Sequence, residues 1–460
     1  MEIIISNRYP SILTTLLFGK MGENIELDIP EFVSFIIKRL KDAGHQAFIV
    51  GGAVRDAYLN RPTFDWDVAT SAIPQKITEV FNDTRHFSLK HGTVTLVDSG
   101  NHFEVTPFRG KKQSLDEDLS LRDFTIDAMA FDPETGRIID PFCGMVDISR
   151  KLITAVGNPG VGNPGSRFQE DPLRLLRAVR LSTELKFRIE KQTLKRLAFQ
   201  AHLLHSVAPE RIREELIKIL VSPKPSTGFN LMVNTGLLRQ FLPELLEGYL
   251  KRQNAYHRYT IFRHIMETVD CVEPDPVLRL TALLHDIAKP RVRKKIDGVW
   301  RFYNHEKESA VLAAKILDQL KFSKDMIRKV TSLIRHHMIA YNSGWSDTAV
   351  RRLIRRVGPE DISDLIVFRR ADIIAHGINN QDLDLLKELE QRIEEQLIGH
   401  VATNTRDLAI DGHEIMKILE MPSGPAVGRI LADLMEKITD HPELNTREKL
   451  LGLLEEIKME

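Results

Sequence analysis

The stretch that decides the fold is residues 47–70, AFIVGGAVRDAYLNRPTFDWDVAT. Its first four residues form an apolar run suited to a buried strand. Gly51 and Gly52 follow, and their flexible backbone can turn and approach a ligand closely. The pattern then predicts a short helix over residues 53–59. A strand, a Gly-Gly turn and a helix in this order aim free backbone N–H groups at whatever lies over the turn, which is a common way to hold a phosphate.

Two aspartates close this stretch. Asp65 and Asp67 are two residues apart in a strand predicted over residues 65–69, so their side chains project from one face while Trp66 points into the core. Arg55, on the predicted helix, adds positive charge near the turn. Two carboxylates facing a phosphate cradle predict divalent metals and nucleotidyl transfer. Taken singly, the Gly-Gly pair is also typical of a plain turn, and the Asp-x-Asp pair of two solvated acids.

Length and composition predict a soluble protein of several domains. The chain has 460 residues, of which 42% are hydrophobic, and this is ample for buried cores. Lys+Arg and Asp+Glu both total 64, so a nucleic acid would have to meet local basic patches. The two cysteines, Cys143 and Cys271, are far apart and favour a reducing cytoplasm without disulfides or a thiolate zinc site. The N-terminal apolar run is too short for a membrane span, and residues 1–28 are interpreted as an arm.

After the opening stretch, the alternation of apolar residues predicts a small α+β domain. A helix is expected over residues 73–81, and strands over 91–97 and 102–108. With the first two strands they would form a small mixed sheet that has its helices on one side. Glu104, in the last of these strands, is a candidate third acid beside Asp65 and Asp67, although an isolated strand glutamate is usually solvent-facing.

Beyond this sheet, two further segments carry charged residues in patterns that suit nucleotides. Residues 121–129, LRDFTIDAM, could contact a triphosphate and ribose, or form a capped helix with surface charges. A tandem duplication, VGNPG at 156–160 and 161–165, is a lengthened loop without assigned chemistry. Past it the periodicity is helical. Asp171 and Arg174 share a helix face and could read a base edge, or form an ordinary intrahelical ion pair.

A second constellation lies in the helical part of the chain. A His-Asp doublet ends an apolar helix, and further histidines and an aspartate lie before and after it. Neutral imidazoles and carboxylates on facing helices predict a divalent metal site. The candidate ligands are His264, His285, Asp286, His305, His336, His337 and Asp372. Basic clusters at 291–295, 351–356 and 369–370 are solvated helix faces or, together with Arg174, Arg177 and Arg180, surface for a polyanion.

Six motifs, in this order, resemble the head and neck of bacterial tRNA nucleotidyltransferases and poly(A) polymerases, the class II nucleotidyltransferases. They are GGAVRD (51–56), DWD (65–67), HGTV (91–94), EVTPFR (104–109), RDFTIDAM (122–129) and EDPLRLLRAVRL (170–181). The histidine and aspartate set resembles an HD phosphohydrolase domain, and His305, His336 and His337 match the additional ligands of its binuclear form.

The resemblance implies a nucleotidyltransferase-type head followed by an all-α neck, an HD-type domain and a helical tail. The implied division is an arm (1–28), a head (29–155), a neck (166–248), the HD-type domain (249–385) and a tail (386–460). It implies that Asp65 and Asp67 hold two magnesium ions for in-line displacement, with Glu104 as a third acid. The HD-type site would hold a divalent transition metal. The implied nucleotide-binding residues are Gly51, Gly52, Arg55, Arg122, Asp123, Glu170, Asp171, Arg174 and Arg177.

The implied reaction is template-independent addition of C residues to the tRNA 3′ end from CTP. Residues 90–94, KHGTV, resemble the tRNA enzymes, since the poly(A) polymerases usually carry an arginine-rich stretch there. Residues 110–121 are a short segment where enzymes that add the full CCA end, using ATP as well, carry a longer flexible loop. A CC-adding enzyme is therefore our hypothesis. The family's usual RRDFTxNAM also differs here, because Leu121 and Asp127 replace an arginine and an asparagine.

Other functions stay open at this point. Full CCA addition and A addition or poly(A) synthesis use the same motifs. A protein that is mainly an HD-type hydrolase with an RNA-binding head is disfavoured by the intact Asp65 and Asp67. In the reading we prefer, hydrolysis at the histidine site is a secondary activity. A binding protein in which both sites are vestigial would show no affinity for magnesium-CTP.

Overall fold

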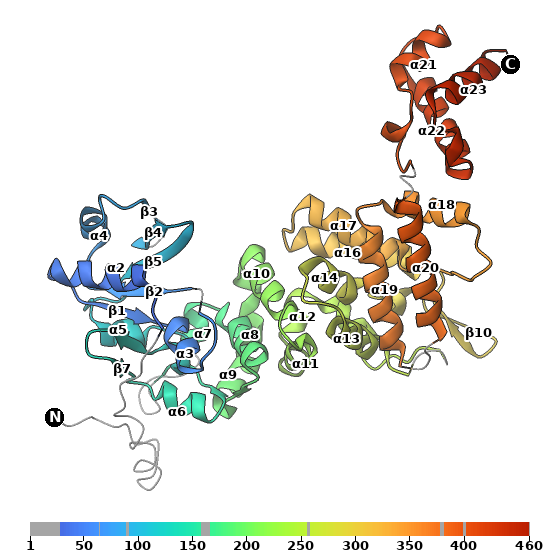
Figure 1. Cartoon of the computed structure of the whole chain (residues 1–460). Helices are drawn as coiled ribbons and strands as arrows, with labels where there is room; N and C mark the ends of the chain where they lie inside the picture. The colour runs from blue at the N-terminus through green and yellow to red at the C-terminus, as the bar shows by residue number, and fades with distance from the viewer. Residues whose placement is uncertain are drawn as a thin grey trace. The chain divides into compact units, whose positions relative to one another are not determined.

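The computed structural model describes residues 28–459 apart from 64, 89–91, 158–165, 255–257, 378–380 and 399–401. The predicted arm, Lys90 and His91 of the KHGTV motif, and nearly all of the duplicated VGNPG loop therefore lie outside the described residues. No helix in the described part of the chain is both long and apolar enough to cross a membrane. Figure 1 shows a domain with a sheet followed by helices, so the predicted α+β class is confirmed.

The described chain forms two compact units. The first contains the residues up to Val207 together with Leu231–Gln240, and the second contains Ala208–Asn230 and the residues from Phe241 onward. Residues 166–248, predicted to be a single neck, thus contribute to both units. The five-part division of the chain stays a prediction.

The first unit is built on a mixed seven-stranded sheet with the order β3-β4-β5-β2-β1-β6-β7. Only β2 and β5 run parallel, and the other neighbours are antiparallel. The strands are β1 (Ala47–Val50), β2 (Asp67–Thr70), β3 (His86–Ser88), β4 (Val94–Asp98), β5 (Asn101–Pro107), β6 (Ala130–Asp132) and β7 (Arg137–Ile139). The first predicted strand is confirmed, but β2 begins two residues later than expected, so Asp65 precedes the strand. Sequence periodicity missed β3, β6 and β7, which have only three residues each.

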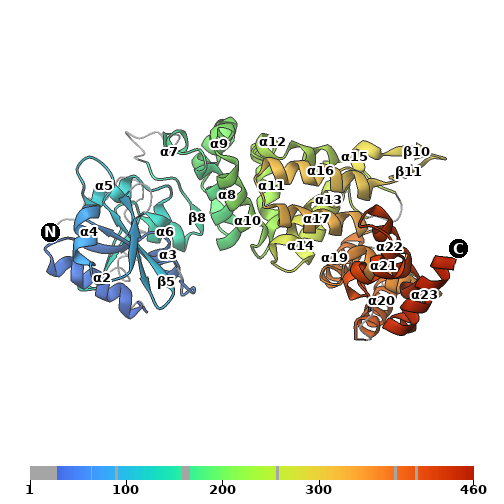
Figure 2. The same ribbon diagram turned by 90° about the horizontal axis from the view of Figure 1, so that it is seen from above.

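Helices cover both faces of this sheet, so the expectation of helices on one side is wrong. The ring of Phe32, on α2, lies 5.0 Å from that of Phe103, and α2 and α4 are side by side on this face (Figure 2). Phe103 and Glu104 are neighbours on β5, so they point to opposite faces. The helices of this part are α2 (Glu31–Asp42), α3 (Gly52–Tyr58), α4 (Pro74–Val80), α5 (Leu115–Ser120), η2 (Thr125–Asp127) and α6 (Gly144–Ser149).

The other face carries α5 and the predicted catalytic acids. Leu119 of α5 joins Val50 and Ala69 in one apolar cluster. Val50 is paired with Asp67, and Asp67 with Glu104, so these three side chains share a face. Arg122, two residues after α5, lies near Asp67 on this face.

After the sheet the chain is helical, as the periodicity predicts. The connecting elements are β8 (Leu152–Ile153), α7 (Ser166–Glu170), α8 (Arg174–Leu185), β9 (Arg188–Ile189), α9 (Lys191–Gln200), η3 (Ala201–Ser206), α10 (Pro209–Leu220), α11 (Pro225–Thr235), α12 (Leu238–Phe241) and η4 (Pro243–Gly248). Amphipathic periodicity explains these helices: α8 buries Leu175, Ala178, Val179 and Leu181 on one side.

The second unit contains a bundle in which α13, α14, α17 and α19 contact one another. Their buried sides are mainly apolar and also carry His264 and Asp372. The remaining elements are α13 (Ile261–Cys271), α14 (Pro276–Leu284), α15 (Lys289–Val292), β10 (Lys294–Ile296), β11 (Val299–Arg301), α16 (His305–Gln319), α17 (Lys324–His336), α18 (Asp347–Val357), α19 (Ile362–His376), α20 (Gln381–Ile398), η5 (Thr405–Asp407), α21 (Gly412–Ile418), α22 (Pro425–Asp440), η6 (Pro442–Leu444) and α23 (Arg447–Met459).

Candidate functional site

The Gly-Gly turn brings three parts of the head together. Gly51 has a φ of 76°, a left-handed conformation that strongly favours glycine. A Cβ atom at this residue would lie 2.7 Å from Nη1 of Arg122 and 3.7 Å from Oδ2 of Asp67. The backbone angle therefore favours glycine, and a side chain here would displace the Arg122 guanidinium. Gly51, Asp67 of β2 and Arg122 of the RDFT motif therefore lie close together.

Three carboxylates gather beside this turn. Asp67 begins β2 and is paired with Glu104 across the parallel strands, while Asp65 is exposed just before the strand. Burial, together with the neighbouring Glu104 and Asp65, raises the pKa of Asp67 to about 6, although Arg122 and Arg109 oppose the shift. Acids that repel one another in this way fit hard divalent cations, which prefer oxygen ligands and would relieve the repulsion.

Asp118 is a buried residue of this site that sequence reasoning missed. Its Oδ2 accepts hydrogen bonds from Nε and Nη2 of Arg122 at 3.2 and 3.1 Å. Its Oδ1 accepts the backbone N–H of Arg109 at 3.1 Å. Asp118 thus positions the two arginines that face Asp67. The signal in the sequence was the acidic run 116–118, of which only Asp118 is buried.

Arg55 is a buried residue of α3, the helix that follows the turn, and it forms two ion pairs. Its Nη1 is 2.5 Å from Oδ1 of Asp127, and its Nη2 is 2.7 Å from Oδ2 of Asp56. Burial opposes the charge, but both carboxylates raise the pKa of Arg55. The acid that stands here in place of the family's asparagine therefore neutralises a buried guanidinium. Contact between Arg55 and a triphosphate stays a prediction.

Replacing Arg55 with methionine is expected to destabilise the head by about 3–5 kcal/mol, because Asp127 would remain buried without its partner. Hydrogen exchange followed by mass spectrometry reports opening of the head separately from that of the bundle. Arg39→Met is the control, since Arg39 pairs with Asp83 at the surface and should change exchange much less. Equal losses of protection in both variants would contradict the assignment.

Two arginines of the EDPLRLLRAVRL motif attach α8 to the RDFT segment. Nε of Arg177 is 2.5 Å from Oδ2 of Asp123, and burial of this carboxyl is outweighed by Arg177, so its pKa is lowered. Nη2 of Arg174 donates to the carbonyl of Leu121 at 3.1 Å. Arg174 also lies 3.5 Å from Glu170. The structure therefore brings Asp123, Glu170, Arg174 and Arg177 together.

Asp171 begins the helix turn that carries this motif. Its Oδ1 accepts the backbone N–H of Leu173 at 3.2 Å, an Asx-type bond that starts the turn before α8. Base reading by Asp171 and Arg174 stays a prediction.

The second unit contains a buried cluster of imidazoles. The Nδ1 atoms of His285, His305 and His337 donate to the carbonyls three residues before each of them, at 2.9, 2.8 and 2.7 Å. His264 Nδ1 lies 3.4 Å from the carbonyl of Ala375. Because a carbonyl only accepts, Nδ1 is the donor in these contacts, and the Nε2 atoms are directed into the cluster. This is the arrangement found behind metal-binding histidines.

Asp286 connects two groups of these nitrogens. Its Oδ2 lies 3.4 Å from His264 Nε2 and 3.3 Å from His285 Nε2, and its Oδ1 lies 3.4 Å from His305 Nε2. His337 completes the second group. Asp286 Oδ1 and His305 Nε2 are buried and, in the described part of the chain, lack hydrogen bonds of good geometry, whereas Asp286 Oδ2 is paired with Lys289. Orphaned buried groups of this kind fit a metal centre with a bridging carboxylate.

Asp372 closes the first group from α19. Its Oδ1 lies 3.0 Å from His264 Nε2 and 3.4 Å from His285 Nε2. Burial raises its pKa, but hydrogen bonds from both histidines and the charge of Arg369 hold that pKa well below the usual range. For His285 the signs are reversed: burial lowers its pKa, but the carboxylates of Asp286 and Asp372 raise it to about 9. The cluster therefore keeps ionised acids that attract cations.

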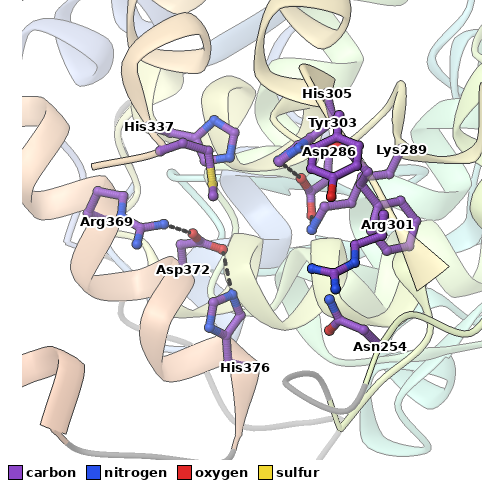
Figure 3. A pocket seen from close by; sticks show the side chains of 12 residues that line it. Asn254, Asp286, Lys289, Arg301, Tyr303, His305, His337, Arg369, Asp372 and His376 are labelled. Carbon is purple, nitrogen blue, oxygen red and sulfur yellow. Dashed lines mark hydrogen bonds and ion pairs between the residues drawn. The ribbon is translucent and has the colours of Figure 1, made fainter. Parts of the chain in front are cut away.

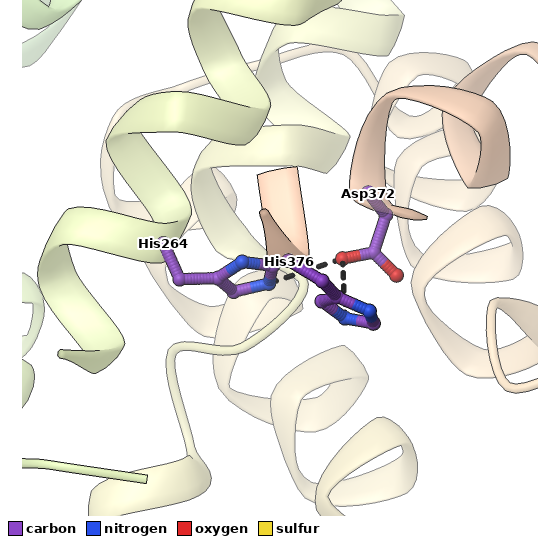
Figure 4. Close-up of side chains that lie close together, drawn as sticks. All are labelled: His264, Asp372 and His376. Carbon is purple, nitrogen blue, oxygen red and sulfur yellow. Dashed lines mark ion pairs between the residues drawn. The ribbon is translucent and has the colours of Figure 1, made fainter. Parts of the chain in front are cut away.

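His376 belongs to this cluster although sequence reasoning missed it. It follows Asp372 by one helical turn, and its Nε2 is 3.7 Å from Asp372 Oδ1 (Figure 4). Burial lowers its pKa to about 4. The signal was the Asp-x-x-x-His spacing on α19. His336, in contrast, is half-buried and is absent from the ligand groups found among the described residues, where His337 takes its place.

A pocket of about 230 Å³ opens onto this cluster (Figure 3). Besides the histidines and acids, three cations line it: Lys289, Arg301 and Arg369. Lys289 Nζ is 2.5 Å from Asp286, and Arg369 Nη1 is 2.5 Å from Asp372. Tyr303 completes the rim. Cations next to a divalent metal site suit phosphate esters, whose charge both would neutralise.

Known protein families match three parts of the chain, and known enzymes match most of its length. The "Poly A polymerase head domain" model matches residues 47–154, "Probable RNA and SrmB- binding site of polymerase A" matches 186–248, and "tRNA nucleotidyltransferase domain 2" matches 299–454. The CCA-adding enzymes of Limosilactobacillus reuteri and Lactobacillus johnsonii are 30% and 31% identical, over 92% and 88% of this chain and 96% and 92% of theirs.

A solved structure extends this likeness to the fold. The Bacillus stearothermophilus CCA-adding enzyme in complex with CTP is 27% identical, with a TM-score of 0.69 over 93% of this chain and 97% of that one. The alignments cover most of the chain, from the head into the helical part. The chain therefore belongs to the tRNA nucleotidyltransferase family that includes the CCA-adding enzymes.

Proposed function

We propose that this enzyme adds C residues to the 3′ end of tRNA from CTP. The observation that carries the proposal is the meeting of Asp65, Asp67 and Glu104 with Arg122 at the Gly51 turn. The relatives at about 30% identity are named for CCA addition, and the structure at 27% identity holds CTP, which supports the same substrates here.

The head residues divide the work of in-line nucleotidyl transfer. Asp65, Asp67 and Glu104 would hold divalent ions, expected to be Mg²⁺, which supply charge neutralisation and activate the RNA 3′-hydroxyl. Arg122 and Arg109, oriented by Asp118, would neutralise the triphosphate as pyrophosphate leaves. Glycine at residue 51 lets the triphosphate approach the backbone.

Arg174 and Asp171 would present donors and an acceptor to the base edge, which replaces a template. Arg177 and Asp123 fix the position of α8 relative to the RDFT segment by their ion pair.

We further propose that addition stops after CC, and that another enzyme supplies the terminal A. Residues 110–121 hold the six-residue α5 and the Asp118 contacts, so little of this segment is left to form a longer mobile loop. Incubating the purified protein with tRNA lacking its 3′ CCA, with CTP and ATP singly and together, should lengthen the RNA by two C residues in each mixture that contains CTP. A terminal A after CC would identify full CCA addition, and A-only extension an A-adding enzyme.

The buried cluster supports a second candidate function, metal-dependent phosphohydrolysis. The bridging position of Asp286 between two histidine groups is the specific observation that favours it. His264, His285, Asp286 and Asp372 would hold one ion, and Asp286, His305 and His337 a second, giving a polarised water for attack on phosphorus. Release of phosphate from p-nitrophenyl phosphate with Mn²⁺ tests it.

A further inference from the structure

His376 is the last residue of α19, and its backbone is held from both sides. Gly377 follows it with a φ of 73°, the left-handed conformation that commonly closes a helix, and donates its N–H to the carbonyl of Ile374 at 3.1 Å. The carbonyl of His376 accepts the backbone N–H of Arg258 at 3.3 Å. The imidazole is therefore carried by a fixed segment, which suits a preorganised metal ligand.

The imidazole of His376 lies against that of His264. The centroids of the two rings are 5.1 Å apart. Asp372 lies one helical turn before His376, on the same face of α19 (Figure 4). One nitrogen of each imidazole and one oxygen of Asp372 all lie within 4.8 Å of one another. These three side chains thus form a group of ligand atoms that a single ion can contact.

The carboxylate of Asp372 divides its two oxygens between a cation and the imidazoles. Its Oδ2 lies 2.5 Å from Nη1 of Arg369. Its Oδ1 lies 3.0 Å from Nε2 of His264, 3.4 Å from that of His285 and 3.7 Å from that of His376. The Nε2 atoms of His264 and His285 are 3.2 Å apart. One oxygen of Asp372 therefore has three imidazole nitrogens around it.

These separations match the spacing of atoms that share one metal ion. Ligand atoms bound at about 2.0–2.2 Å are roughly 3.0–3.5 Å apart in octahedral or tetrahedral coordination. The contacts of Asp372 with His264 and His285 fall in this range, and the contact with His376 is slightly longer. His376 also lines the pocket that opens onto the cluster.

The other acid of this group is shared with a cation. Oδ2 of Asp286, the oxygen that faces His264 and His285, also lies 2.5 Å from Nζ of Lys289. A positive charge beside this oxygen weakens its attraction for a metal ion. A further donor on the Asp372 side is therefore of use to the ion, and His376 supplies one.

We propose that His376 is a ligand of the ion held in the first group, and that it makes this position selective for a first-row transition ion over Mg²⁺. The set then contains three imidazoles beside the Asp372 carboxylate. Imidazole favours ions such as Co²⁺, Ni²⁺ and Zn²⁺, whereas Mg²⁺ prefers oxygen. The site in the head offers carboxylates, so the two sites would take different ions from one mixture. The inference rests on the proposed metal-dependent phosphohydrolase, and it names a ligand and the metal class of that site.

Metal binding to the full-length protein tests this assignment without a substrate. The protein is freed of metal with a chelator and titrated with Co²⁺ in excess Mg²⁺, which occupies the head, and the visible absorption of bound Co²⁺ is followed. His376→Ala should raise the Kd for Co²⁺ at least about tenfold, because a nitrogen ligand is lost. His376→Gln, which keeps much of the side-chain volume, should have the same effect. His336→Ala is the control and should change the Kd by less than about twofold.

A carboxylate at this residue distinguishes a ligand from a side chain that only packs against His264. His376→Glu should still bind an ion, but its preference for Co²⁺ over Mn²⁺ should fall about tenfold, since an oxygen ligand suits the harder ion. Packing alone would leave the preference unchanged. Dialysis against both ions together, followed by elemental mass spectrometry of the protein, measures the ratio.

The outcomes separate this inference from the phosphohydrolase. Wild-type affinity for Co²⁺ in both His376→Ala and His376→Gln, or an unchanged preference in His376→Glu, would overturn the ligand assignment. Release of phosphate from p-nitrophenyl phosphate by the wild-type protein would then leave the hydrolase standing. Weakened Co²⁺ binding in the variants of a protein that releases no phosphate would keep the ligand and remove the hydrolase. A wild-type protein that takes up no Co²⁺ would remove both.

Discussion

Replacing Asp67 with asparagine is expected to abolish CMP incorporation into tRNA, with a loss of about 10³-fold or more. The amide keeps the shape of the side chain but loses the charge that would hold a divalent ion between β2 and β5. Charge stabilisation by such an ion contributes several kcal/mol in the transition state, and each factor of ten corresponds to about 1.4 kcal/mol. Single-turnover extension of tRNA lacking CCA, with CTP and Mg²⁺, measures the effect.

Asp98→Asn is the matched control for this variant. Asp98 ends β4 on the same sheet and is partly buried, but it lies outside the group around Gly51. Its replacement should change incorporation by less than about twofold. If Asp67→Asn retains a tenth of the activity or more, the catalytic metal must be held by other residues.

Replacing His337 with alanine is expected to eliminate phosphohydrolysis, by at least about 100-fold, and to leave CMP incorporation within about twofold. His337 Nε2 is directed toward Asp286 and His305 in the second ligand group, so its loss removes a ligand that no other residue of the group replaces. Phosphate release and the number of bound ions, measured by elemental mass spectrometry, should fall together.

His336→Ala is the control, because His336 is half-buried and is absent from the ligand groups found among the described residues. Its pKa is lowered by burial and by the nearby charge of Arg356. It should keep the metal and the hydrolysis. With Asp67→Asn, which should lose incorporation and keep hydrolysis, the variants separate the two sites. Loss of incorporation in His337→Ala with correct folding would show instead that the cluster serves the nucleotidyl transfer.

Much of the head was predictable because its motifs are local. Gly51, Gly52 and Asp67 lie within twenty residues, and the alternation of apolar residues was sufficient to find β1, β4 and β5 to within a few residues. The three-residue strands were missed because two faces cannot be told apart over so short a run. The six-residue helix α5 was not predicted either, and the face of the sheet that it covers depends on strands that are distant from it in sequence.

The sequence by itself determined the family and the helical character of the second half, and it supplied the candidate residues of both sites. These depend on motif order and on periodicity within a few turns. Only the tertiary structure decided that Asp118 orients Arg109 and Arg122, that Arg55 is paired with Asp127, and that His376 rather than His336 lies at the cluster. The reason is physical, since each of these assignments depends on side-chain directions and on burial between segments that only the packed fold brings together.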